Sequence, residues 1–261
     1  MTPVRRSTRL FAALAGVLAV TTACTTQSGS DNSAQQRSTP AKAGTPSPVK
    51  SPARSPSTAH SPAEPATGPD LLEAARSGDT DAVREALRRG ADVETRDENR
   101  RTPLLLAVTG NHVKAAQTLI EAGADPDALD QQHDTPWLVT GVTGSAAMAR
   151  TLTAAHPDYT VVNRYGGTSL IPASERGHAE YVREVTTNPQ IDIDINHVNN
   201  LGWTALLEAV ILGNGGQDHQ EVVKLLLEAG ADRSITDRDG VSPLQHARRH
   251  GYTEIAQLLR Q

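Results

Sequence analysis

The sequence predicts an all-α repeat solenoid of about six stacked units, including the caps, and three observations carry that prediction. A residue suited to a tight turn recurs every 33 to 38 positions along the second half of the chain. An apolar run follows each recurrence, and several of these runs close with the tripeptide Gly-Ala-Asp. Units of this length bury their apolar faces only by stacking on their neighbours.

The recurring turn residues share one property, which is that they tolerate a positive φ. Glycine adopts this conformation freely and asparagine accepts it, so either residue can end a helix. The residues are Gly78, Asn111, Gly144, Gly177, Gly213 and Gly251, with spacings of 33, 33, 33, 36 and 38. We expect each of them to separate two short antiparallel helices.

The first helix of each unit has its own start signal. A hydroxyl residue caps the helix, and in several units proline follows at the first helical position, where no amide donor is needed. These starts are Thr102-Pro103, Thr135-Pro136, Thr168-Ser169, Thr204-Ala205 and Ser242-Pro243. The second helices close at the Gly-Ala-Asp tripeptides that begin at Gly90, Gly123 and Gly230.

With these signals, residues 70–261 resemble the ankyrin repeat family, whose unit is about 33 residues long. The resemblance implies ankyrin-type stacked helix pairs with β-hairpin fingers between the units. It also implies a concave face that binds other macromolecules. The function expected from it is a non-catalytic protein-protein interaction scaffold, with no cofactor, no catalytic residue and no metal.

The beginning of the chain predicts export. Arg5, Arg6 and Arg9 precede an uncharged apolar run at residues 10–20, which is typical of a signal peptide and short for a membrane span. Small residues then lead to Cys24, in a pattern that resembles the lipobox of bacterial lipoproteins. We expect residues 1–23 to be the signal peptide and Cys24 to carry the lipid. The alternative is a secreted soluble protein.

Residues 24–69 predict a disordered linker. Residues 25–69 hold 8 of the 16 prolines and 15 serines or threonines, none of which can build a core. The linker would hold the folded part clear of a membrane surface.

The charge of the folded part excludes two classes of partner. Residues 70–261 hold 18 Lys or Arg and 28 Asp or Glu, a net charge of −10. Nucleic acid and anionic lipid both require a basic face, so we expect no nucleic acid and no membrane contact beyond the lipid anchor. The expected partner is another protein, bound outside the cytoplasm by a monomer.

Three departures from the repeat indicate where something besides stacking is selected. The finger between Pro189 and Thr204 is three residues longer than its counterpart, and alternating Ile and Asp or Asn at residues 191–196 predict a short strand there. Residues 214–218 are inserted between two helices and predict an exposed loop. Pro172, at the fourth position of its helix, should loosen the first turn.

The histidines are assigned to the scaffold. His112, His178 and His219 share one repeat position at the start of the second helices, which favours packing over metal binding. The His that usually follows Thr-Pro-Leu in the family is absent, so we expect apolar contacts to replace its hydrogen bonds between repeats.

The predicted partner-binding residues are polar or aromatic at positions that project from the fingers or into the concave face. They are Asn163, Arg164, Tyr165, His197, Asn199, Asn200, Trp203 and Glu208. One alternative stays open at each of two residues. Trp203 could fold over the neighbouring isoleucines in place of binding a partner, and Glu208 could be exposed without contacting a partner.

Two other functions compete with the scaffold. The first is an enzyme, or a small-ligand or metal receptor, that uses the enlarged finger around residues 190–203. The second is a structural spacer at the cell surface.

Overall fold

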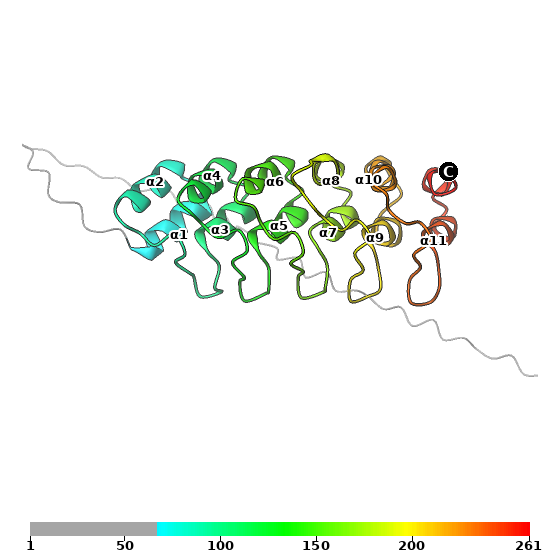
Figure 1. Ribbon diagram of the computed structural model, residues 1–261, viewed down its shortest axis with the longest axis horizontal. Helices are drawn as coiled ribbons and strands as arrows, with labels where there is room; N and C mark the ends of the chain where they lie inside the picture. Colours follow the sequence, from blue (N-terminus) through cyan, green and yellow to red (C-terminus); the bar gives the residue numbers. More distant parts are fainter. Residues whose placement is uncertain (1–66) are drawn as a thin grey trace, which may run out of the picture. The chain divides into compact units, whose positions relative to one another are not determined.

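A computed structural model of the protein describes residues 67–261. The predicted signal peptide, Cys24 and almost all of the predicted linker lie outside the described residues. Within them the chain forms twelve helices in six antiparallel pairs, as the repeat predicts. Figure 1 shows the pairs side by side, as an inner and an outer row of helices with loops projecting beyond the inner row.

The inner row consists of the first helix of each pair. These helices are α1 (Gly68–Ser77), α3 (Pro103–Thr109), α5 (Pro136–Thr143), α7 (Leu170–Glu175), α9 (Ala205–Ile211) and α11 (Pro243–His250). The outer helices are α2 (Thr80–Arg88), α4 (Val113–Glu121), α6 (Ala146–Thr153), α8 (Ala179–Thr187), α10 (Gln217–Glu228) and α12 (Thr253–Leu258). Helices this short are not stable alone in water, so each depends on the contacts it makes within its row and its pair.

The predicted helix starts are confirmed in four of five units. The side-chain oxygens of Thr102, Thr135, Thr204 and Ser242 each accept a hydrogen bond from the backbone N–H three residues later, at 3.1 to 3.3 Å. Thr168 is the exception, because its buried hydroxyl has no partner. There α7 begins only at Leu170 and is six residues long, and Pro172 falls in its first turn. Pro172 is the third residue of α7, one position earlier than the sequence predicts, and the looser turn stays a prediction.

Neighbouring units are joined at the start of the outer helices. The rings of His112, His178 and His219 donate from Nε2 to a backbone carbonyl near the end of the preceding inner helix, at 3.1, 3.3 and 2.9 Å. Tyr252 makes the equivalent bond from its hydroxyl to Gly213 at 2.8 Å. The histidines are thus part of the scaffold, as expected. The expectation that apolar contacts replace the family histidine in the inner helices is confirmed in four units, where the residue at that position is buried: Leu105, Leu138, Ile171 and Leu207. The hydrogen bonds from the outer helices link the units in addition.

The same rings explain why the preceding turn needs glycine. Gly144 has φ +70°, and a Cβ at this position would lie 2.4 Å from the ring of His178. Gly78 stands in the same relation to His112, with 2.3 Å. Gly213 lacks the positive φ that its phase predicts, and Gly215, with φ +71°, takes that role beneath Tyr252.

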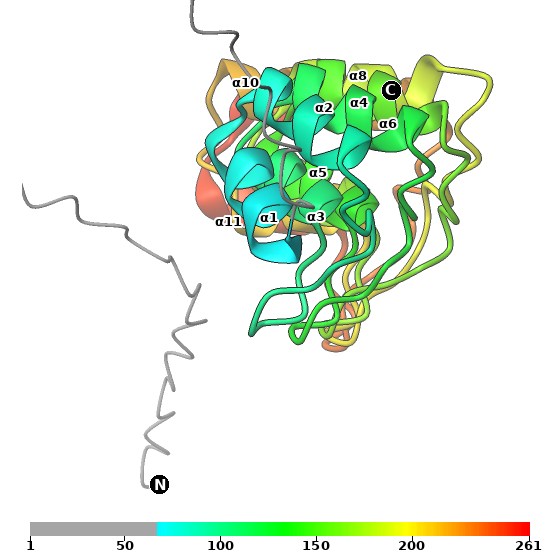
Figure 2. The same ribbon diagram turned by 90° about the vertical axis from the view of Figure 1, so that its left-hand side faces the viewer.

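Five fingers connect the pairs, and we number them 1 to 5 along the chain. Each has the same closing turn, in which the first residue and the fifth share a backbone hydrogen bond. The five turns span residues 97–101, 130–134, 163–167, 199–203 and 237–241. The hairpin form is as expected, but residues 67–261 contain no β-strand. Figure 2 shows the fingers extending together from one side of the helices.

The strand predicted at residues 191–196 is wrong. The amides of Ile191 and Asn196 are taken up by local turns at Asn188 and Asp194, so none of this segment pairs with another chain segment as a strand. Its alternation is still real, since Ile191 and Ile193 are buried and the aspartates beside them are exposed. The three extra residues lie between α8 and finger 4, whose turn has the same length as the others.

The insertion at residues 214–218 is only partly a loop. Residues 212–216 form the connection, whereas Gln217 and Asp218 already belong to α10. The insertion therefore makes α10 twelve residues long, against nine for α8.

We predict that the contact between His178 and Gly144 couples units 3 and 4. Gly144→Ala should destabilise the protein by about 1 to 3 kcal/mol, because it combines an unfavourable φ with a clash against the ring. His178→Ala should cost about 1 to 2 kcal/mol. The double variant should cost clearly less than the sum, since the clash is gone. Urea unfolding of the four proteins measures this.

Gly251→Ala is the matched control, because Gly251 has φ +74° and nothing within 4 Å of its Cβ position. It isolates the cost of the backbone conformation. Additive effects of the two substitutions in units 3 and 4 would contradict the coupling.

Candidate functional site

Each finger is closed by one Asn or Asp side chain at its first position. Oδ1 of Asn163 accepts from the backbone N–H groups of Tyr165 and Gly167, at 2.9 and 3.0 Å. Oδ1 of Asn199 accepts from Leu201 and Trp203 in the same way. Aspartates do this in the other three fingers. Two of the predicted partner-binding residues, Asn163 and Asn199, therefore hold the turns.

Fingers 3 and 4 are fastened to each other. His197 donates from Nε2 to the carbonyl of Gly166 at 2.6 Å, and the backbone N–H of Asn200 donates to the carbonyl of Tyr165 at 2.9 Å. Gly166 permits this approach, because a Cβ there would lie 2.5 Å from the amide of Asn200. The structure thus brings the two predicted groups of site residues together in one pair of fingers.

Tyr165 is the most exposed large apolar side chain among the described residues, at 56%. The guanidinium of Arg164 lies 4.6 Å from the centre of its ring, and the same group lies 3.5 Å from Asp134 of finger 2. A cation over an aromatic face is a favourable contact that restricts the ring. Arg164 and Tyr165 therefore form an accessible surface feature with a defined orientation.

Trp203 and Glu208 are placed differently from the finger tips. Trp203 is half-buried. Its exposure thus lies between that of a projecting binding anchor and that of a ring folded down over the isoleucines. Glu208 lies on α9 and is only 4% exposed. The alternative of simple exposure is wrong for Glu208, because the neighbouring inner helices and the base of finger 4 cover it.

The buried carboxyl of Glu208 is incompletely compensated. Nδ2 of Asn199 donates to its Oε1 at 2.8 Å. Burial raises the pKa of Glu208 to about 7, and the nearby Glu175 acts in the same direction. Unit 6 has a related pair, in which Nε2 of His246 lies 2.7 Å from Oδ2 of Asp237. In units 5 and 6 the finger base is thus bonded to a titratable residue of the inner helix.

The sequence analysis missed a set of exposed apolar residues on the fingers. Leu129, Val162 and Val198 each precede the Asn or Asp that closes fingers 2, 3 and 4, and they are 40%, 37% and 46% exposed. Leu201, at the position in finger 4 that corresponds to Tyr165, is 50% exposed. The repeat phase would have found them, because 129, 162 and 198 follow the spacings of 33 and 36.

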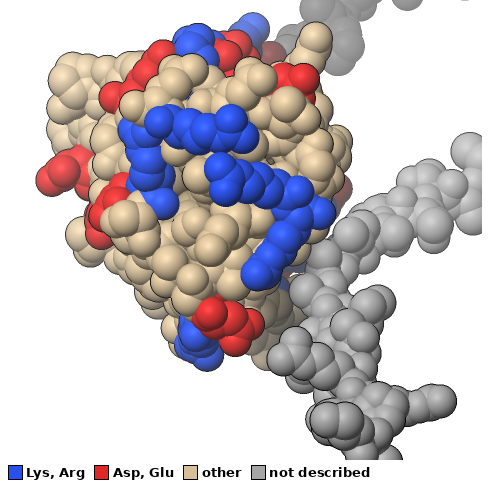
Figure 3. All heavy atoms as spheres, turned by 90° about the vertical axis from the view of Figure 1, so that its right-hand side faces the viewer, with Lys and Arg blue, Asp and Glu red and all other residues tan. Residues whose placement is uncertain are grey.

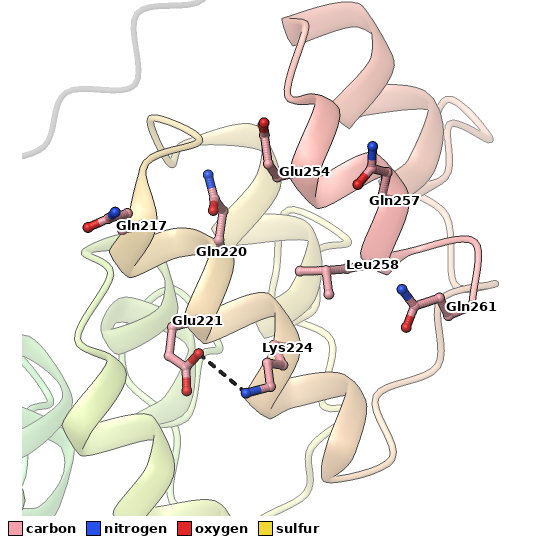
Figure 4. A pocket seen from close by; sticks show the side chains of 8 residues that line it. All are labelled: Gln217, Gln220, Glu221, Lys224, Glu254, Gln257, Leu258 and Gln261. Carbon is pink, nitrogen blue, oxygen red and sulfur yellow. Dashed lines mark ion pairs between the residues drawn. The ribbon is translucent and has the colours of Figure 1, made fainter.

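A shallow hollow among the described residues lies elsewhere. Figure 4 shows it between α10 and α12, where Gln217, Gln220, Gln257 and Gln261 surround a volume of about 420 Å³. Glu221 at its wall pairs with Lys224 at 3.7 Å and with Arg183 at 2.7 Å. None of the predicted site residues lines it. No group of three His, Cys, Asp or Glu within residues 67–261 is arranged to hold a metal ion.

A family model for ankyrin repeats matches residues 71–163, 137–237 and 191–261. Together these matches span almost all of the described residues. The chain belongs to the ankyrin repeat family.

Three relatives agree with this assignment. YahD of Escherichia coli, named as an ankyrin repeat protein, is 40% identical over 190 residues, which are 73% of this chain and 94% of YahD. The crystal structure of an ankyrin repeat domain from Acinetobacter baumannii has 47% identity and a TM-score of 0.68, and the match covers 73% of this chain and 95% of that domain. The ankyrin repeat protein EF0377 has 40% identity and a TM-score of 0.70, over 74% and 96% of the two chains.

Ankyrin repeats generally mediate protein-protein interaction. The fingers of this ankyrin domain are closed by hydrogen-bonded turns. Across residues 67–261, no helix combines the length and the apolar character needed to span a membrane.

We predict that Glu208 makes stability fall as pH rises. The folded protein keeps the proton between the ordinary pKa of 4.5 and about 7, whereas the unfolded chain releases it, so the stabilisation present at low pH is lost on the way to pH 7. Glu208→Gln removes the titration and keeps the acceptor for Asn199. The variant should exceed the parent by about 1 to 3 kcal/mol at pH 8 and match it near pH 4.5.

Thermal unfolding of both proteins from pH 4.5 to 8 tests this. An advantage of the variant that does not change with pH would show that Glu208 is already ionised when it is buried.

Proposed function

We propose that this chain is a non-catalytic scaffold that binds another protein through the tips of fingers 3 and 4. The observation that carries the proposal is Tyr165, which is 56% exposed at the end of a finger that is hydrogen-bonded to its neighbour. Tyrosine supplies a large contact area at a small entropic cost, and such residues are enriched among those that dominate binding energy.

The neighbouring apolar residues extend this surface. Leu201 occupies the corresponding position on finger 4, and Val162 and Val198 lie at equivalent positions of the two fingers. Because fingers 3 and 4 are fastened together, little conformational freedom would be lost on binding. We assign the contact to Tyr165, Arg164 and Leu201. Asn163, Asn199, Asn200 and His197 position them.

We further propose that the protein acts outside the cytoplasm and is held to the membrane by a lipid on Cys24. The support comes from the sequence, in which basic residues, a short apolar run and small residues precede Cys24. The linker of residues 24–69 would then separate the ankyrin domain from the membrane. Replacing Cys24 with Ser should move the protein from the membrane fraction to the soluble exported fraction.

A small-ligand, metal or enzyme site at residues 190–203 is less well supported. Several polar side chains of this segment are already bonded to the protein's own backbone or side chains. Asn196 bonds the backbone of Gly230 and Asp232, and His197 bonds Gly166. Asn199 holds both its own turn and Glu208. A ligand would have to displace these contacts.

We predict that Tyr165 contributes to binding and little to stability. A photo-crosslinking amino acid at position 165, introduced in the native cell envelope, should yield one dominant adduct with a protein. Tyr165→Ala should then weaken binding of that protein by about 2 kcal/mol and leave the melting temperature within about 1 °C.

Leu212 is the matched control, because it is 42% exposed but lies at the turn after α9, away from the fingers. The crosslinker at position 212 should give no such adduct. Equal adducts from both positions, or none from position 165, would argue against this surface and in favour of a structural spacer.

A further inference from the structure

A single side chain, that of Asn199, joins the base of finger 4 to the inner helix α9. Its Oδ1 closes the turn by accepting from the backbone N–H groups of Leu201 and Trp203, at 2.9 and 3.0 Å. Its Nδ2 donates to Oε1 of Glu208 at 2.8 Å. The residue that shapes the finger is therefore also bonded to a buried carboxyl group.

The connection continues from finger 4 to the exposed surface of finger 3. The backbone N–H of Asn200 donates to the carbonyl of Tyr165 at 2.9 Å. His197 donates from Nε2 to the carbonyl of Gly166 at 2.6 Å. A displacement at the base of finger 4 would therefore release the backbone of Tyr165 as well.

Finger 4 differs from the other fingers in what holds its base. Units 2, 3 and 4 have an apolar or proline side chain at the position of Glu208, namely Leu106, Val139 and Pro172. Unit 6 has His246 there, and its partner Asp237 is an acid bonded to a base. Among the five fingers, finger 4 alone is bonded to a carboxyl group of an inner helix.

The carboxyl group of Glu208 has no cationic partner. It is 4% exposed and forms no ion pair with any of residues 67–261. Helices α7, α10 and α11 pack against α9. From α7, Glu175 presents a like charge, and the guanidinium of Arg176 is bonded to the carbonyl of Val142 at 3.3 Å.

The other two helices supply no compensating charge either. On α11, His246 is bonded to Asp237 at 2.7 Å, and Arg248 and Arg249 are exposed. Figure 3 shows Lys and Arg side chains at the surface over this end of the domain. The charged residues of α10, none of which forms a hydrogen bond or ion pair with Glu208, are Asp218, Glu221, Lys224 and Glu228.

The ionised form of Glu208 needs more hydrogen-bond donors than the stack provides. A neutral carboxyl group accepts from Asn199 at little cost, whereas a buried carboxylate with one hydrogen bond is strongly unfavourable. Burial accordingly raises the pKa of Glu208 to about 7, and Glu175 acts in the same direction. Above this pH the carboxylate is stabilised if water enters. The finger is the cover that opens most easily, because it is a connecting segment and the other covers are packed helices.

We propose that a proton on Glu208 locks fingers 3 and 4 in their binding form, and that loss of this proton releases finger 4 from α9. The consequence, which rests on the proposed function of the fingers, is tighter binding of the partner protein at mildly acidic pH. The locked form carries the proton, so it is fully populated below pH 7 and is lost as the pH rises. If only this form binds, the apparent dissociation constant rises about tenfold between pH 6 and pH 8.

Hydrogen exchange of the purified full-length chain at pH 6 and pH 8 tests the switch. Protection factors are compared, because they remove the intrinsic pH dependence of exchange. The amides of Asn200 and Trp203 should lose about tenfold in protection at pH 8. In E208Q they should keep it, because glutamine accepts from Asn199 and does not ionise. E208L, which copies Leu106 of unit 2, should also show no dependence on pH.

Fingers 1 and 2 provide the matched control within the same molecule. The backbone N–H of Gln131 donates to the carbonyl of Asn99 at 2.9 Å, as that of Asn200 does to Tyr165. Protection of Gln131 should not change between pH 6 and pH 8. Unchanged protection of finger 4 in the parent would overturn the switch. An equal loss in E208Q would assign the effect to His197, and an equal loss at Gln131 would make it global, so either result would also overturn it.

Photo-crosslinking from position 165 in isolated cell envelopes tests the consequence for binding. The yield of the adduct should fall from pH 6 to pH 8 in the parent and stay constant in E208Q. A pH-dependent loss of protection without an adduct at either pH would support the switch and contradict the proposed function. An adduct from the parent whose yield is the same at both pH values would show that binding does not require the locked fingers, and would overturn the inference.

Discussion

The structure depends on one contact that recurs between neighbouring units. A ring at the start of four of the six outer helices, α4, α8, α10 and α12, donates to a carbonyl at or near the end of the preceding inner helix and lies over the turn of that preceding unit. His178 over Gly144 is one example, and Tyr252 over Gly215 is the last. The helices are mostly six to ten residues long and cannot persist alone. Where the ring is present, its hydrogen bond helps to set the register of the two units that it joins.

Fixing the register at the helix ends leaves the fingers free for another purpose. Their shape comes from their own Asn or Asp side chains, which close each turn without help from a sheet. Exposed residues such as Tyr165 and Leu201 can therefore vary at little cost to the stack. Chemistry that binds a partner concentrates where stability does not require a particular side chain.

Sequence reasoning succeeded where a local rule repeats. The period, the hydroxyl caps and the turn glycines each follow from one residue and its near neighbours, so all six helix pairs were predictable. The strand at residues 191–196 failed because Asn188 and Asp194 form turns that compete with strand pairing. The burial of Glu208 was not predicted, because its surroundings include Asn199 and Glu175, which come close to it only in the folded stack.

The candidate site was predictable in position and less so in role. Tyr165 is exposed on a finger as the sequence indicates, but Asn163 and Asn199 turn out to support their own loops. The apolar residues Val162 and Val198 escaped notice because a single exposed valine carries no signal. Only alignment of the repeat phase makes them a set.

Native-state hydrogen exchange of the backbone amides tests most directly whether the stack is held by contacts between adjacent units. Opening should proceed in blocks that follow the unit boundaries, and α7 should be the least protected interior inner helix, since Pro172 and the unpartnered hydroxyl of Thr168 weaken its first turn. A single free energy of opening shared by all six helix pairs would contradict the account.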